Sequence, residues 1–203
     1  VSSKEIVCTT PANATGSYDV LVAVNKMQTS RLSAGFTYMP DPMVTNISPD
    51  YGISAGATLV TITGKEFKEG AIVDFGGASC EDVKVISSTT LTCVTTAHEG
   101  GSVDVTITNT TNQSGTSRAA FTYRAPPDVS NISPNAGALA GSTSITLTGS
   151  NFLSGITVSL GGGSCSNVRV LSTSSLTCTT PAHASGTVSV TVTNSDAQMK
   201  TVE

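Results

Sequence analysis

The sequence repeats itself without a gap at a distance of 85 residues, and this repeat restricts the possible folds more than any other feature. The repeated positions include cysteines, Phe-Thr-Tyr and Asn-Ile-Ser-Pro stretches, and a Gly–Phe pair. They are Cys8, Cys93 and Cys178; Cys80 and Cys165; residues 36–38 and 121–123; residues 46–49 and 131–134; and Gly64 and Phe67, which return as Gly149 and Phe152. Such a period is too long for a helical or leucine-rich solenoid unit but suits a small β-sandwich. We therefore expect tandem homologous domains.

Within each repeat, apolar residues alternate with Thr and Ser at a period of two, as in half-buried antiparallel strands. In the central copy, residues 57–64 read ATLVTITG, and similar segments follow between clusters of Gly, Ser, Asn and Thr. These segments are residues 71–77, 83–87, 90–96, 102–108 and 118–123. No helical spacing of apolar residues persists for three turns. The pattern predicts an all-β chain of tandem immunoglobulin-like β-sandwiches with about seven strands each.

Proline-containing segments join the repeats, Met-Pro-Asp-Pro at residues 39–42 and Arg-Ala-Pro-Pro at 124–127. Proline fixes φ and restricts the preceding residue, so these joints are expected to be stiff and the chain to be an elongated rod. Each domain would add about 30–40 Å to its length. The register predicts the C-terminal half of a domain, with its last three strands, at 1–41, a complete domain at 42–126, and a domain without its final strand at 127–203. We therefore interpret the chain as a window on a longer array.

The order of small, apolar and cysteine positions in the central copy resembles the IPT/TIG family of immunoglobulin-like domains, which occurs in plexins, transcription factors and cell-surface proteins. The third copy adds a Thr-Pro-Ala-His turn at residues 180–183, and a Phe-Thr-Tyr stretch closes the second. The positions that carry the resemblance are Val44, Ile47, Pro49, Gly52, Gly56, Thr58, Val60, Ile62, Gly64, Phe67, Gly76, Gly77, Cys80, Val85, Leu91 and Cys93. Thr96 departs from the turn pattern, since Pro11 and Pro181 stand at the equivalent positions. The resemblance implies a fold rather than an activity, because this fold hosts many functions.

The cysteines of each repeat are separated by 13 positions. A structural zinc site needs four ligands, usually as closely spaced pairs, and a catalytic cysteine needs a histidine and would not recur in every repeat. We therefore predict the disulfides Cys80–Cys93 and Cys165–Cys178, and we expect Cys8 to pair with a cysteine upstream of the chain. The alternative is a set of buried free thiols in a reducing compartment. Disulfides would place the protein outside the cell or at the cell surface.

Asn-x-Ser/Thr sequons offer candidate sites for N-glycosylation. Asn13, Asn109 and Asn112 fall in expected turns or loops, whereas Asn46 and Asn131 lie in an expected first strand and rank lower. Asn and Thr are so common in this chain that such triplets also arise by chance, and turns favour Asn in any case.

Composition and spacing exclude several classes of protein. The net charge is −4 and no Lys/Arg cluster occurs, which argues against nucleic-acid binding. No apolar run reaches the roughly 18–20 residues that a membrane helix needs, so no membrane insertion is expected within this segment. His98 and His183 are equivalent positions expected in turns, and no metal or cofactor site is predicted; calcium at a joint, on Asp41 or Asp128, is the alternative. The remaining acidic residues considered, Asp50, Asp74, Asp82 and Asp104, do not form a calcium loop.

We therefore predict that the chain is not an enzyme but a structural segment of a long extracellular fibre, stalk or filament. The alternatives are the ligand- or cell-binding ectodomain of a surface receptor or adhesin, and accessory modules of a secreted carbohydrate-active enzyme. The similarity of the repeats and the stiff joints favour a structural segment. The absence of Trp favours it too, since recognition sites usually carry aromatic or Arg anchors. The expected partners are neighbouring domains or copies of the same chain, together with covalent glycans. We expect flanking sequence to complete the end domains, with strand donation by another chain as the alternative.

Overall fold

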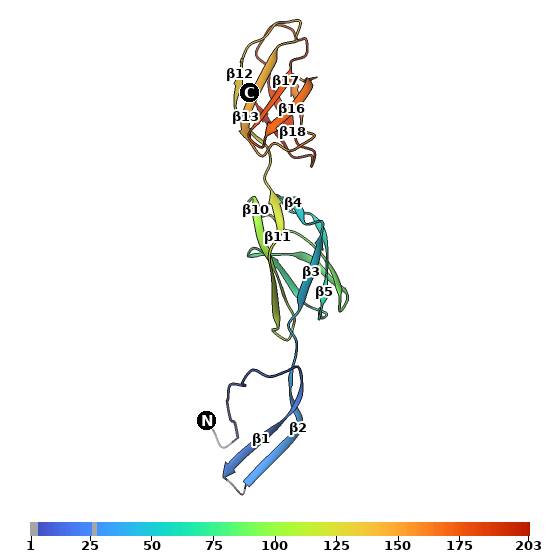
Figure 1. Cartoon of the computed structure of the whole chain (residues 1–203), viewed down its shortest axis with the longest axis vertical. Coiled ribbons are helices and arrows are strands. Elements are labelled where there is room, and N and C mark those ends of the chain that lie inside the picture. Colours follow the sequence, from blue (N-terminus) through green and yellow to red (C-terminus); the bar gives the residue numbers. More distant parts are fainter. Residues whose placement is uncertain (1–3, 26–27) are drawn as a thin grey trace.

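The computed structural model describes residues 4–25 and 28–203, and the described part contains strands, turns and loops but no helix. Three units follow one another along the long axis of the molecule (Figure 1). Unit 1 is a β-hairpin, and units 2 and 3 are β-sandwiches of two sheets each. The predicted all-β fold of immunoglobulin-like sandwiches is thus confirmed.

Unit 2 packs a four-stranded sheet against a five-stranded sheet. The first has the order β3-β5-β9-β8 and the second the order β4-β11-β10-β6-β7. The strands are β3 (Met43–Ser48), β4 (Tyr51–Ile53), β5 (Leu59–Lys65), β6 (Ile72–Phe75), β7 (Ala78–Ser79), β8 (Glu81–Ser87), β9 (Thr90–Val94), β10 (Gly101–Thr108) and β11 (Ser114–Arg124). Alternate residues of β5, β9, β10 and β11 point between the sheets, where Ile62, Leu91, Ile107, Phe121 and Tyr123 are each at most 1% exposed. The period-two pattern of the sequence therefore defines this core.

Unit 3 repeats this arrangement, with sheets β12-β13-β17-β16 and β15-β14-β18-β19. Its strands are β12 (Asp128–Ser133), β13 (Ser144–Ser150), β14 (Thr157–Leu160), β15 (Gly163–Ser164), β16 (Ser166–Ser172), β17 (Ser175–Thr179), β18 (Val190–Thr193) and β19 (Met199–Val202). Its core contains Leu147, Leu176 and Val192, each fully buried. Three strands differ from unit 2: β18 is shorter than β10, β19 is shorter than β11, and β4 has no counterpart among the described residues of unit 3.

Unit 1 consists of β1 (Gly16–Asn25) and β2 (Gln28–Tyr38), which pair in an antiparallel hairpin. The sequence predicted a third strand here, equivalent to β9, but residues 5–10 form no strand. In unit 2, β9 lies between β5 and β8, and no counterpart of these two strands occurs among the described residues of unit 1. Backbone without neighbours to pair with does not form a strand.

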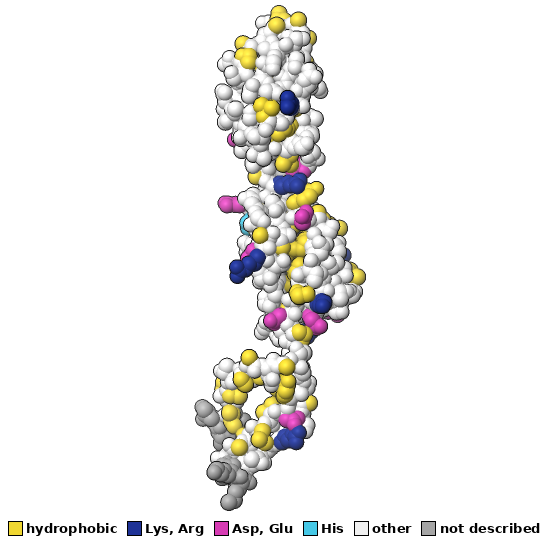
Figure 2. All heavy atoms as spheres, viewed as in Figure 1, with side chains coloured by type: hydrophobic (Ala, Val, Ile, Leu, Met, Phe, Trp, Pro, Cys, Tyr) yellow, Lys and Arg dark blue, Asp and Glu magenta, His cyan; other side chains and the backbone are white. Residues whose placement is uncertain are grey.

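The apolar face of the β1–β2 hairpin is uncovered. Tyr18, Val20, Val22 and Phe36 are 37–41% exposed, although their counterparts in unit 2 are core residues. Figure 2 shows hydrophobic side chains gathered along this hairpin.

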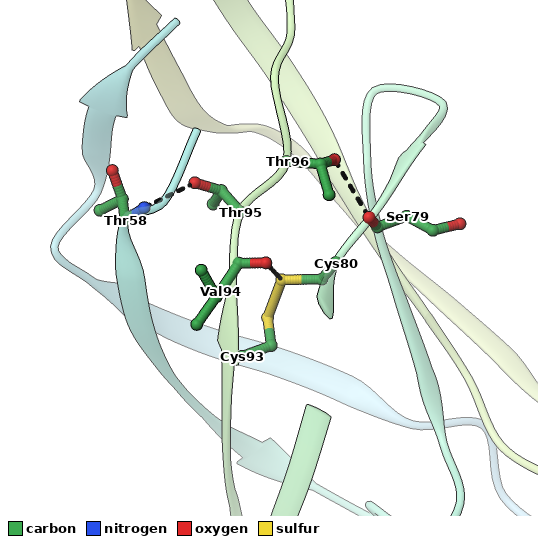
Figure 3. Close-up of a disulfide and its surroundings, with 7 residues drawn as sticks. All are labelled: Thr58, Ser79, Cys80, Cys93, Val94, Thr95 and Thr96. Atoms are coloured by element: carbon green, nitrogen blue, oxygen red, sulfur yellow. Dashed lines mark hydrogen bonds between the residues drawn. A yellow bond between two sulfur atoms is a disulfide. The ribbon is translucent and has the colours of Figure 1, made fainter. Parts of the chain in front are cut away.

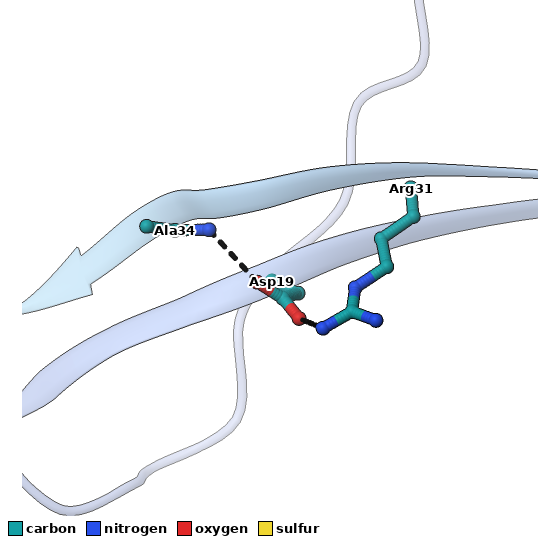
Figure 4. A network of polar contacts seen from close by, with 3 residues as sticks. All are labelled: Asp19, Arg31 and Ala34. Carbon is teal, nitrogen blue, oxygen red and sulfur yellow. Dashed lines mark hydrogen bonds and ion pairs between the residues drawn. The ribbon is translucent and has the colours of Figure 1, made fainter.

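A β-bulge in the hairpin is stabilised by a carboxylate. Asp19 accepts a hydrogen bond of 2.8 Å from the backbone N–H of Ala34, whose φ is +48°, and also pairs with Arg31 (Figure 4). The same bulge occurs in unit 2, where Asp104 accepts from Ala119 N–H at 2.8 Å. The bulged residue has no partner in the ladder, so the Asp side chain satisfies its amide.

Candidate functional site

The structure joins Cys80 and Cys93 in a disulfide with Cα atoms 6.0 Å apart. Cys80 lies between β7 and β8, where the chain crosses from the five-stranded to the four-stranded sheet, and Cys93 lies on β9, an inner strand of the four-stranded sheet (Figure 3). Neighbouring threonines brace the same region: Thr95 Oγ1 accepts from Thr58 N–H at 3.1 Å, and Thr96 Oγ1 donates to the Ser79 carbonyl at 3.0 Å. The bond therefore links the crossover between the two sheets to β9, rather than linking two adjacent strands of one sheet.

Cys165 and Cys178 occupy the equivalent places in unit 3 but are thiols in the structure, where the sequence predicts a second disulfide. Their backbones match those of unit 2, since Cys165 N–H donates to Val158 at 2.9 Å as Cys80 N–H does to Val73 at 2.8 Å. Burial raises the pKa of both thiols, most strongly that of Cys178, which is 2% exposed. The pairing stays a prediction.

Cys8 is an exposed thiol before the hairpin of unit 1. Its predicted partner lies upstream of the chain, so that pairing also stays a prediction.

Asn109 is the least accessible of the predicted glycosylation sites, because this residue is only 2% exposed. Its amide accepts from Lys68 N–H at 3.1 Å and donates to the Glu66 carbonyl at 2.8 Å, which ties the β10–β11 turn to the loop after β5. Asn194 makes the same two contacts in unit 3, with Leu153 N–H at 3.1 Å and the Asn151 carbonyl at 2.8 Å. The sequence analysis missed this structural role, which the repetition of Asn109 as Asn194 could have indicated.

The other candidate glycosylation sites are exposed. Asn112 lies in the β10–β11 turn with φ +64°, and Asn13 precedes β1, where its side chain accepts from Ala14 N–H. Asn46 and Asn131 are exposed on β3 and β12, which are edge strands. These four side chains leave room for a sugar, and their occupancy stays a prediction.

The two histidines lie in equivalent loops of units 2 and 3. His98 stacks on Tyr123 with ring centroids 4.9 Å apart and an angle of 19°, and its Nε2 lies 3.3 Å from the Gly76 carbonyl. His183 has no such neighbour among the described residues and lines an open groove. Within residues 4–25 and 28–203, no three His, Cys, Asp or Glu side chains come together as metal ligands would.

Unit 3 has an open groove with a volume of about 480 Å³. Its apolar lining comes from both sheets and from the turns around residues 136 and 184. The lining includes Ile132, Gly137, Leu160, His183, Val188 and Val190. A smaller hollow of about 250 Å³ lies in unit 2 between β3 and β11.

Comparison with known proteins agrees with this geometry. The sequence pattern of the IPT/TIG domain matches residues 42–123 and 127–202, which cover units 2 and 3. The chain belongs to the IPT/TIG family. The resemblance noted in the sequence is therefore confirmed.

Relatives of this IPT/TIG chain include fibrocystin-L of Mus musculus, 29% identical over 152 residues, and fibrocystin-L of Homo sapiens, 29% identical over 173 residues. The matches cover 75% and 81% of this chain but only 4% of each relative's length. Among solved structures, the full extracellular region of plexin A4 is 24% identical, with a TM-score of 0.43, over 79% of this chain and 17% of that one. No described helix of this chain is long and apolar enough to cross a membrane.

Proposed function

We propose that this chain is a non-catalytic structural segment of an extracellular fibre or stalk, in which successive IPT/TIG sandwiches are held in line by stiff joints. The observation that carries the proposal is the joint between units 2 and 3. Side chains of both units contact the connecting segment, and these contacts resist bending of the joint. Pro126 and Pro127 restrict the backbone of the same segment further.

Arg124 is the central residue of this joint. Its guanidinium carbon lies 3.4 Å from the centroid of the Tyr51 ring in unit 2, a cation–π contact. Its backbone carbonyl accepts a hydrogen bond of 3.0 Å from Gln198 Nε2 in unit 3. Unit 2 holds the side chain, and the carbonyl is shared between Ser54 N–H of unit 2, at 2.8 Å, and Gln198 of unit 3. Lys200 and Asp128 form an ion pair at 3.2 Å within unit 3, which contributes little because both side chains are about half exposed.

An extracellular location is supported by the Cys80–Cys93 disulfide, because such bonds persist in oxidising compartments. The surface supports the same assignment, since only 12% of residues are charged and the polar surface depends on Ser, Thr and Asn. We place N-glycans on the exposed Asn13 and Asn112, where they would shield a stalk from proteolysis.

The proposal is tested by electron microscopy of native material labelled with an antibody against this segment. We expect label outside the cell, repeated at regular spacing along an extended fibre or stalk. Label inside the cell, or on compact particles that bind a soluble ligand, would contradict the proposal.

The joint is tested separately by small-angle X-ray scattering of the purified chain. Three units in line predict a maximum dimension on the order of 100 Å, from the strand rise per residue. The double substitution Arg124→Ser and Gln198→Ala should shorten the average dimension by loosening the joint. Arg169→Ala, which removes an exposed Arg far from the joint, is the matched control and should change nothing.

A further inference from the structure

The two sheets of unit 2 are joined on one side of the sandwich and open on the other. On the side of β7 and β8, the chain crosses between the sheets and the Cys80–Cys93 disulfide holds the crossover. On the opposite side, β3 is the edge strand of its sheet and contacts β11 of the other sheet. The short strand β4 pairs only with Thr122–Arg124, so the preceding residues of β11 have no strand beside them on this side within the described part of the chain. The hollow of about 250 Å³ between β3 and β11 lies on this open side.

Two polar side chains of the hollow, those of Asp50 and Ser117, have no hydrogen-bond or ionic partner among the described residues. Ser117 lies opposite the buried Val105 in the β10–β11 ladder, which puts its half-buried side chain on the inner face of the sheet. The Asp50 carbonyl accepts a hydrogen bond of 2.9 Å from Thr122 N–H, and this bond fixes the Asp50 backbone beside β11. A carboxylate and a hydroxyl that are held in place but unpaired can bind a ligand that carries its own donors and acceptors.

A glycosylation sequon lies along the same hollow. Asn46 lines the hollow and begins the triplet Asn46-Ile47-Ser48 of β3. Ile47 is 6% exposed and packs in the core, whereas Asn46 and Ser48 are exposed, because alternate residues of a strand point to opposite faces. The core contact of Ile47 therefore holds the triplet extended, with the amide and the hydroxyl outside.

The size and lining of the hollow suit a single sugar residue. Pockets for drug-sized molecules measure roughly 300–1,000 Å³, and this hollow is smaller. A 2-acetamido sugar, which N-glycosylation attaches to Asn, carries hydroxyl and amide groups that match Asp50 and Ser117. Val44 and Ala120 supply apolar surface for its acetyl methyl group.

We propose that Asn46 carries an N-linked glycan whose first sugar occupies this hollow. In the attachment reaction, the Asn46 amide nitrogen bonds to the anomeric carbon of a sugar on a lipid-diphosphate donor. The bond from that carbon to the diphosphate oxygen breaks, and the lipid diphosphate leaves with the amide proton. In the folded chain, a sugar hydroxyl donates to the Asp50 carboxylate, and the Ser117 hydroxyl donates to a sugar oxygen.

The bound sugar links the two sheets on the open side of unit 2, because it is attached to β3 and contacts β11. It also covers the backbone edge of β3, which is otherwise free to pair with a strand of another molecule. The inference goes beyond the proposed function and rests only on its extracellular location, since N-glycans are attached to secreted proteins.

Unit 3 repeats the sequon as Asn131-Ile132-Ser133 but lacks the two polar groups. Asn135 stands at the position of Asp50, and Val202 stands at that of Ser117. Val202 packs against the core of unit 3. A sugar on Asn131 therefore meets neither a carboxylate nor a hydroxyl, and we expect it to extend into solvent.

The test uses the whole chain secreted from a eukaryotic host that attaches N-glycans. Glycopeptide mass spectrometry should find Asn46 occupied. Ser48→Ala, which removes the sequon but keeps Asn46, should lower the thermal midpoint of unit 2 by about 4–8 °C, as expected for the loss of one or two hydrogen bonds in a domain of this size. Trimming the glycans to their first sugar with an endoglycosidase should leave the midpoint of the unaltered chain in place.

Two controls separate the sugar from the substitution. Ser133→Ala removes the equivalent sequon of unit 3 and should change neither midpoint. In a host without N-glycosylation, Ser48→Ala and the unaltered chain should unfold at the same temperature, which shows that Ser48 itself contributes nothing.

A double variant then tests the hollow. Asp50→Asn with Ser117→Val gives unit 2 the residues of unit 3 and keeps the sequon. The glycan should stay attached, but Ser48→Ala in this background should shift the midpoint by less than about 2 °C, because the sugar has lost its contacts. Proton NMR of the trimmed, unaltered chain should show the acetyl methyl group close to the methyl group of Ala120.

The outcomes distinguish this inference from the proposed function. Asn46 without sugar, in molecules whose Asn13 or Asn112 is glycosylated, would overturn the inference and leave the extracellular location intact, because the chain has then met the glycosylating enzyme. An occupied Asn46 whose loss has the same effect with and without Asp50 and Ser117 would also overturn it, because the sugar then does not bind in the hollow. Native material that lacks sugar at every sequon and lies inside the cell would overturn both.

Discussion

Reduction of the Cys80–Cys93 disulfide should lower the stability of unit 2 by an amount that the structure allows to be calculated. The bond joins residues 13 positions apart, and loop closure over about this length restricts the unfolded chain by roughly 3 kcal/mol. A domain of about 80 residues has an unfolding entropy near 0.17 kcal/mol/K, so the midpoint should fall by roughly 15–20 °C. Reduction keeps both sulfur atoms in place, which separates loop closure from the loss of core volume that substitution would cause.

Calorimetry of the unreduced and reduced chain measures this change, with thiol counting by mass spectrometry on the same samples. Unit 3 supplies an internal control, because its cysteines are thiols in the structure and its transition should not respond to the reductant. A fall of less than about 5 °C in unit 2 after complete reduction would refute the loop-closure reasoning. A fall in both units, with Cys165 and Cys178 paired before reduction, would instead establish the second disulfide that the sequence predicts.

Three further predictions concern single sites. Asn109→Ala should destabilise unit 2 by about 2–4 kcal/mol, because it leaves buried backbone groups unpaired, whereas Asn112→Ala in the same turn should change little; thermal unfolding compares them. In reduced protein, burial raises the folded-state pKa values of Cys165 and Cys178 above the ordinary 9.0. The two thiols therefore stabilise unit 3 fully below pH 9.0, and this stabilisation is lost as pH rises through the folded-state pKa values. The thermal midpoint of unit 3 should fall above pH 9.0, and the double Ala variant should not show this fall. Tyr123→Phe should keep or raise the midpoint of unit 2, since the buried hydroxyl has no hydrogen-bond partner among the described residues; a fall above about 1 kcal/mol would contradict this.

The candidate glycosylation sites show that a local sequence motif does not predict whether its side chain is exposed. Asn109 and Asn112 lie three positions apart in one turn and both match the sequon, yet one is buried and the other exposed. The difference arises from the loop after β5, since Asn109 bonds to Glu66 across 43 positions of sequence. A local motif carries no information on such a contact. The repetition of Asn at position 194 is a sequence signal that could have indicated a structural role.

The third strand predicted for unit 1 fails for a related reason. Residues 5–10 resemble β9 in sequence, but a strand exists only where neighbours accept and donate its backbone hydrogen bonds. The β1–β2 hairpin forms because its two strands are adjacent along the chain and pair with each other.

The residues alone were sufficient for the all-β class, the 85-residue period, the IPT/TIG resemblance and the core positions of units 2 and 3. These depend on alternation between neighbouring residues, which a strand with one buried face requires wherever it occurs. Tertiary structure decided that the Cys80–Cys93 bond links two sheets, that Asn109 is buried, and that Arg124 is held from both sides. Each of these depends on which distant segments meet.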